Sequence, residues 1–153
     1  MASWHNYNSC EHQSPKFGYR NAEIVASAAD AMAKLIREAF PNDEIALIFV
    51  DGSSATLAVA TMLRLLDDNG LSNVYVHSAA NLKSEFPPEH AIRPRLPYAK
   101  AVFVDDFHCV GSALKACRLW IGRPLDLAIF IDRGETPINT ENADRVITLK
   151  DEE

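Results

Sequence analysis

Two adjacent carboxylates, Asp105 and Asp106, follow the apolar run 101–104 and are the side chains in this sequence best placed to do chemistry. The run predicts a buried strand, and a helix-compatible run at 112–121 begins after a short turn that contains Gly111. In open α/β sheets, ligands lie at the carboxyl ends of strands, where backbone N–H groups at helix starts bind phosphate. Carboxylates one step away suit vicinal hydroxyl groups or a hydrated Mg²⁺ ion. The stretch therefore predicts a site for a phosphorylated sugar.

A second strand-to-helix turn rich in small residues lies earlier in the chain. The apolar run 45–50 predicts a fully buried, parallel strand, and a helix is expected to continue to about Asn69, before Gly70. Between them stand Asp51, Gly52, Ser53 and Ser54. Two such turns on strands expected to be neighbours indicate one shared site. The alternatives are a plain connection capped by a serine at the first turn and an acidic turn without a ligand at the second.

The remaining pattern supplies a scaffold. An amphipathic helix is expected from residue 22 to about residue 40, where Pro41 follows. Further strands are expected at 73–77, 126–131 and 145–149.

Length and composition narrow the class of protein. The 153 residues, 48% hydrophobic and 24% charged, predict one globular domain at 21–153, preceded by an arm or hood segment at 1–20. The net charge of −6 argues against nucleic acid as a partner, and no apolar run is long enough to span a membrane. Three cysteines form no recognisable disulfide framework and residues 1–20 contain no apolar secretion signal, so we expect a cytoplasmic protein.

The stretch 101–114 resembles the 5-phosphoribosyl-1-pyrophosphate (PRPP) motif of type I phosphoribosyltransferases. That motif is an apolar strand, two acidic residues, and a small loop rich in hydroxyl groups and glycine that enters a helix. Residues 102–106 fit it well, and Gly111 and Leu114 fall where the family has glycine and an apolar residue.

The tail of the chain resembles one branch of that family. Residues 127–134 end in Asp-Arg-Gly and are followed closely by Pro137-Ile138, as in the bifunctional pyrimidine operon regulator and uracil phosphoribosyltransferase type. Together the two resemblances cover roughly residues 22–150. They imply a single-domain α/β fold with an open, mostly parallel sheet and helices on both faces.

The resemblance also implies roles for residues. Asp105 and Asp106 would hold the ribose hydroxyls and, through water, Mg²⁺. The 5′-phosphate would lie on Phe107, His108, Cys109, Val110, Gly111, Ser112 and Ala113. The pyrophosphate would lie on Asp51, Gly52, Ser53 and Ser54, with Mg²⁺ between it and the Asp51 carboxylate. The polar, proline-rich segment 78–100 takes the place of the mobile loop that closes over the reaction centre, where Arg93 and Arg95 would act on the leaving pyrophosphate.

Several positions depart from the family pattern. Val110 and Ala113 stand where the family usually has threonine. Ser53 stands where the regulator branch has an arginine, and 78–82 lacks that branch's Tyr-Arg-Asp-Asp-Leu segment. The sequence therefore has fewer basic side chains than the family pattern places around pyrophosphate.

Three functions remain open. The first is an enzyme, expected to be a dimer, that moves a 5-phosphoribosyl group between PRPP and a nitrogenous base, its small-molecule substrates. The second is a module of the same fold that binds PRPP or a nucleotide without turnover. The third is an RNA-binding attenuation regulator, which the acidic balance disfavours.

Overall fold

A computed structural model of the chain describes residues 22–50, 52–69, 74–78, 99–108, 112–133 and 141–152. Several sequence-based predictions lie outside these ranges. They are the arm or hood at 1–20, the two arginines of the 78–100 segment, Asp51, and the turn residues Cys109, Val110 and Gly111.

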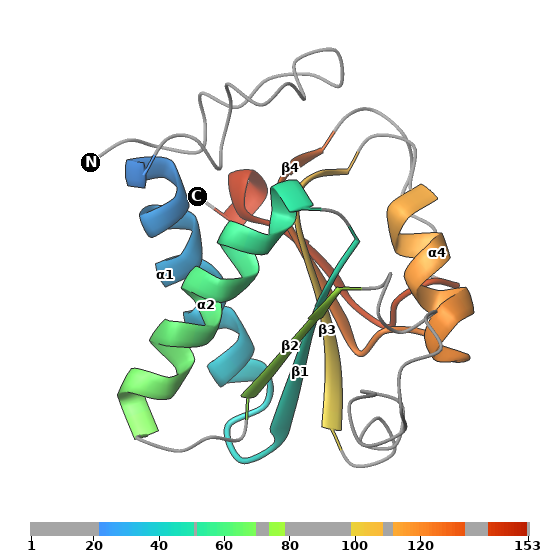
Figure 1. Ribbon diagram of the computed structural model, residues 1–153, viewed down its shortest axis with the longest axis horizontal. Helices are drawn as coiled ribbons and strands as arrows, with labels where there is room; N and C mark the ends of the chain where they lie inside the picture. Colours follow the sequence, from blue (N-terminus) through green and yellow to red (C-terminus); the bar gives the residue numbers. More distant parts are fainter. Residues whose placement is uncertain are drawn as a thin grey trace.

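The centre of the molecule is a five-stranded sheet in which every pair of neighbouring strands is parallel. Its order is β2-β1-β3-β4-β5, so β3 lies in the middle (Figure 1). The strands are β1 (Glu44–Phe49), β2 (Val74–Ser78), β3 (Ala99–His108), β4 (Leu127–Arg133) and β5 (Val146–Thr148). The strand order and direction confirm the predicted α/β sheet.

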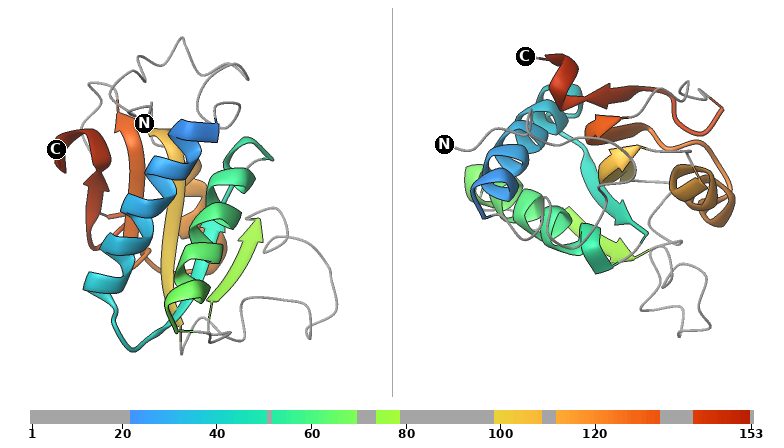
Figure 2. Two further views of the ribbon diagram at one scale, coloured as in Figure 1. Left: turned by 90° about the vertical axis from the view of Figure 1, so that its left-hand side faces the viewer. Right: turned by 90° about the horizontal axis from the view of Figure 1, so that it is seen from above.

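Helices cover both faces of this sheet. Seen from above in Figure 2, α1 (Ala22–Ala39) and α2 (Gly52–Asn69) lie on one side and α4 (Ser112–Ile121) lies on the other. A short 3₁₀ helix, η6 (Leu149–Glu152), follows β5. Among the helices of the described ranges, none is both long enough and apolar enough to cross a bilayer.

The core consists of two apolar layers separated by the sheet. On β3, Val102 and Val104 belong to the layer under α1 and α2, whereas Ala101 and Phe103 belong to the layer under α4. The Phe103 ring packs against that of Phe130 on β4, with centroids 5.7 Å apart. Burial on both faces explains why residues 101–104 of β3 form an unbroken apolar run instead of an alternating one.

Two strands continue further than the apolar runs that predicted them. β3 was expected at 101–104 but reaches His108, and β4 was expected to end at residue 131 but reaches Arg133. The reason is that the two strands continue to pair: Phe107 is in register with Asp132, and His108 with Arg133. Asp105, Asp106, Phe107 and His108, which were expected to follow the strand, therefore lie within β3, and Asp132 lies within β4.

Candidate functional site

The candidate site lies where the path of the chain changes direction in the sheet. β1 and β3 are parallel neighbours, and Ile48, near the carboxyl end of β1, is in register with Phe103 in the middle of β3, which continues to His108. The chain leaves β1 through α2 to reach β2 on one side, and leaves β3 through α4 to reach β4 on the other. In open α/β sheets of this order, the crevice between those two strand ends is where ligands bind.

Asp105 joins the two halves of this switch point. Its Oδ1 accepts a hydrogen bond from the Ser54 hydroxyl at 2.7 Å and another from the Asp106 backbone N–H at 2.8 Å. Ser54 belongs to the first turn of α2, so the bond crosses from the β1 side to β3. Burial of Asp105, together with the hydrogen bond and the negative charge of the Asp106 carboxyl, holds the pKa of Asp105 well above its usual value.

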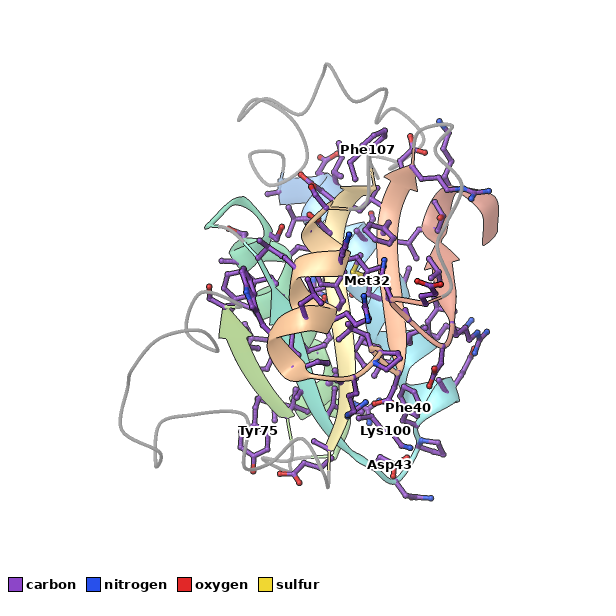
Figure 3. All side chains as sticks on the ribbon, turned by 90° about the vertical axis from the view of Figure 1, so that its right-hand side faces the viewer. Met32, Phe40, Asp43, Tyr75, Lys100 and Phe107 are labelled. Carbon is purple, nitrogen blue, oxygen red and sulfur yellow. The ribbon has the colours of Figure 1, made fainter. Side chains whose placement is uncertain are left out.

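Asp106 is as enclosed as its neighbour, since each of the two is only 9% exposed. Asp106 Oδ1 accepts the Phe107 backbone N–H at 2.8 Å. The Phe107 side chain is 3% exposed and lies at the carboxyl end of β3 (Figure 3), where it joins the apolar layer under α1 and α2. The Phe107 backbone N–H therefore already donates to the Asp106 carboxylate within the protein. The phosphate contact expected of Phe107 stays a prediction, without support from this bond.

A third buried carboxylate lies beside these two, and sequence reasoning missed its role. Asp132 occupies the β4 position in register with Phe107 and is 4% exposed. Its Oδ1 accepts the Arg133 backbone N–H at 2.7 Å, and its Oδ2 lies 3.1 Å from Nζ of Lys150 in η6. The Asp-Arg-Gly run at 132–134 is part of the family resemblance, but nothing in the sequence connects Asp132 with a lysine beyond β5.

Of the other predicted site residues, five lie within the described ranges and six lie outside them. Gly52 and Ser53 lie in the first turn of α2, and Ser112 and Ala113 lie in the first turn of α4. Both helix starts follow the carboxyl ends of their strands, which places backbone N–H groups at that edge. His108 is the last residue of β3. Asp51, Cys109, Val110, Gly111, Arg93 and Arg95 lie outside the described residues.

One buried thiol also lies near the site. Cys117, on the inner side of α4, is fully buried in the layer between that helix and the sheet. Burial, and to a lesser extent the charge of Asp105, raises its pKa to about 12. Such a thiol stays neutral at physiological pH, which makes Cys117 a packing residue and not a nucleophile.

Asp105 and Asp106 suit a Mg²⁺ ion that is held through water. Within the described ranges, no three His, Cys, Asp or Glu side chains gather closely enough to form an all-protein metal cage. Asp105 and Asp106 form the smaller donor set that Mg²⁺ uses when a ligand's phosphates and water complete its shell. Because Oδ1 of each already accepts an amide N–H, contact through water fits these residues better than direct coordination.

By sequence, no known protein family matches the chain, and no curated protein matches it either. By structure, it is similar to adenine phosphoribosyltransferase from Saccharomyces cerevisiae, solved with an imino-altritol bisphosphate and adenine: TM-score 0.60, 17% identity, 86% of this chain and 82% of the other covered. It is also similar to xanthine-guanine-hypoxanthine phosphoribosyltransferase from Helicobacter pylori: TM-score 0.53, 15% identity, 84% of each chain covered. The finer resemblance of the tail to the pyrimidine regulator branch stays a prediction. At these identities the likeness establishes the architecture, and the chain has the type I phosphoribosyltransferase fold.

Proposed function

We propose that this protein binds PRPP or a nucleoside monophosphate at the switch point and transfers a 5-phosphoribosyl group to or from a nitrogenous base. The observation that carries the proposal is the Asp105–Asp106 pair at the carboxyl end of β3, bonded across the switch point to Ser54 of α2. In this position two carboxylates can accept the vicinal hydroxyls of a ribose. The starts of α4 and α2 flank them, with N–H groups suited to a phosphate on either side.

Catalysis at such a site would rest on position and charge. The sugar is held by its hydroxyls and its 5′-phosphate, while the reacting carbon develops positive character and pyrophosphate leaves. Mg²⁺, held through water by Asp105 and Asp106, would supply charge to the pyrophosphate. Arg93 and Arg95 remain the predicted side chains for the same task on the protein's part.

The base is the open part of the proposal. The two similar structures described above are purine phosphoribosyltransferases by name, whereas the tail of this sequence resembles the pyrimidine regulator and uracil phosphoribosyltransferase branch. A test of function therefore has to offer purines and pyrimidines together. A dimeric state and a cytoplasmic location belong to the same proposal.

The first experiment measures ligand binding by thermal unfolding in the presence of Mg²⁺. Ribose 5-phosphate, PRPP and a nucleoside monophosphate should each raise Tm. A hundredfold excess over Kd adds about 2.7 kcal/mol, or about 5–11 °C for a domain of this size. The double variant Asp105→Asn/Asp106→Asn should lose that shift, measured against its own ligand-free Tm. A matched control is Asp43→Asn, which changes an exposed carboxylate at the opposite end of the sheet (Figure 3).

The second measurement separates an enzyme from a binding module. Binding with release of pyrophosphate in the presence of a base supports transfer, whereas binding without release supports a nucleotide sensor of the same fold. Absence of a thermal shift with all three ligands would contradict both functions.

A further inference from the structure

The hydrogen bond between Ser54 and Asp105 joins two elements that are 51 residues apart in the chain. It has an ordinary O–H···O length of 2.7 Å and is buried, since Ser54 is 1% exposed and Asp105 is 9% exposed. A buried hydrogen bond between two side chains is costly to break, because breaking it leaves buried polar groups without partners. The bond therefore restrains the start of α2 relative to the end of β3.

Packing directs this hydroxyl toward β3. One turn further along α2, Leu57 and Ala58 are buried in the layer between that helix and the sheet, at 2% and 0% exposure. This fixes the rotation of the helix and points the first-turn residue Ser54 inward. The sequence places Ser54 among the ligands of pyrophosphate, but the structure directs its hydroxyl to a carboxylate of the protein.

The proposed ligand has two ends that need two separate helix starts. The 5′-phosphate would lie at the start of α4 and the pyrophosphate at the start of α2, with the ribose over β3 between them. A ligand held at both ends gains affinity only if the two ends of the site are correctly spaced. Asp105 belongs to β3, the strand that leads into α4, and is bonded to the first turn of α2, so this bond connects the strand before one helix start with the other helix start.

We propose that Ser54 and Asp105 form a latch that sets the spacing between the two phosphate-binding ends, and that Ser54 is a positioning residue and not a pyrophosphate ligand. The inference rests on the proposed function, since it concerns how one site accommodates a ligand that spans both helix starts. It distinguishes ligands by length. PRPP needs both ends, ribose 5-phosphate needs only the α4 end, and inorganic pyrophosphate needs only the α2 end.

The test is calorimetric titration of the full-length protein with those three ligands, in Mg²⁺, for wild type and Ser54→Ala. The variant should bind PRPP about tenfold more weakly, while its affinities for ribose 5-phosphate and for pyrophosphate change by less than about twofold. Ser54→Thr keeps the hydroxyl and should restore PRPP affinity. Thr61→Val is the matched control: it removes another buried hydroxyl of α2, one that donates to the Leu57 carbonyl at 2.8 Å, and should leave all three affinities as in wild type.

Each other outcome contradicts the latch in its own way. Weaker pyrophosphate binding in Ser54→Ala would make Ser54 a direct ligand, and tighter ribose 5-phosphate binding would mean that its hydroxyl competes with the sugar for Asp105. Equal loss for all three ligands, or no loss for any, would remove the positioning role. If wild type binds none of these three ligands and no nucleoside monophosphate either, the proposed function itself fails, and the latch with it.

Discussion

Nζ of Lys150 lies 3.1 Å from Oδ2 of Asp132, so η6 is bonded to the carboxyl end of β4, one strand away from the Asp105–Asp106 pair. The two side chains differ in exposure, at 40% for the lysine and 6% for the aspartate. Asp132 Oδ1 accepts the Arg133 backbone N–H in addition. The carboxylate is thus almost fully enclosed and depends on these two donors for the solvation it loses on folding.

Removing the lysine should destabilise the fold. Lys150→Met leaves the Asp132 carboxylate with its backbone donor but without its cation. The partly exposed position of Lys150 limits the expected loss to about 1 kcal/mol. Urea unfolding measures the change, with Lys115→Met as the control at an exposed lysine of α4. The single variant Asp132→Asn and the double variant Lys150→Met/Asp132→Asn complete a thermodynamic cycle, and a coupling energy of zero would show that the contact contributes nothing.

Asp105→Asn should stabilise the protein at neutral pH. The folded-state pKa of Asp105 lies well above its ordinary value of 3.8, because of burial and the Asp106 carboxyl. The stability that this group contributes is therefore complete below pH 3.8 and is lost as pH rises through the folded-state pKa. Asparagine never ionises, and its side-chain oxygen can still accept from Ser54. The gain should exceed the ~0.5 kcal/mol typical of surface changes.

The measurement is urea unfolding of wild type and Asp105→Asn at about pH 4, 6 and 8, where the difference should grow with pH. Asp43→Asn should shift stability by less than ~0.5 kcal/mol at each pH, since this carboxylate is exposed. A variant that is less stable than wild type at about pH 8 would mean that the ionised carboxylate is needed for folding.

Cys117 should react with thiol reagents only when the protein unfolds. A pKa raised from 9.0 to about 12 lowers the thiolate fraction, and burial within the α4 layer blocks access. At about pH 8 ionisation alone slows labelling about 10³-fold relative to the unfolded chain. The experiment uses a Cys10→Ser/Cys109→Ser background, so that Cys117 is the only thiol, and compares labelling with and without denaturant. Rapid labelling of the native protein would place Cys117 on an accessible surface.

Any transferase activity should be weak in kcat rather than in affinity for PRPP. The groups expected to hold the ground state, Asp105 and Asp106, are present, whereas Ser53 and the 78–82 segment replace groups expected to neutralise the leaving pyrophosphate. One missing electrostatic contact of this kind lowers the rate about 10²–10³-fold. Losing interactions that strengthen only in the transition state leaves substrate affinity nearly unchanged.

Steady-state kinetics with uracil, orotate, adenine, hypoxanthine and guanine, alongside calorimetric PRPP affinity, checks this expectation. Arg93→Ala and Arg95→Ala test whether either arginine supplies the missing charge: the rate should collapse while PRPP still binds. A kcat near the ~10 s⁻¹ of an average enzyme, insensitive to both substitutions, would contradict it.

The sequence by itself determined the elements and the architecture. The apolar periodicity of 22–39 reflects burial of one face of a helix. The apolar runs at 45–50 and 101–104 reflect burial of both faces of a strand. A hydrophobicity pattern predicts an element because it depends on which faces of that element are buried. The Asp105–Asp106 pair stood out because two carboxylates between an apolar strand and a helix start suit a phosphorylated sugar, and because the stretch resembles the PRPP motif. Their position at the carboxyl end of β3 followed from the direction of the chain alone.

Only the tertiary structure decided where the strands end and which side chains meet. A hydrophobicity pattern does not reveal a strand end made of polar residues, but the ladder between β3 and β4 continues as long as both backbones can pair. It therefore includes Asp105 and Asp132. The contacts of Ser54 with Asp105 and of Lys150 with Asp132 join residues far apart in the chain. Such contacts depend on strand order and helix rotation, which are set by the packing of the whole core and leave no trace in local spacing.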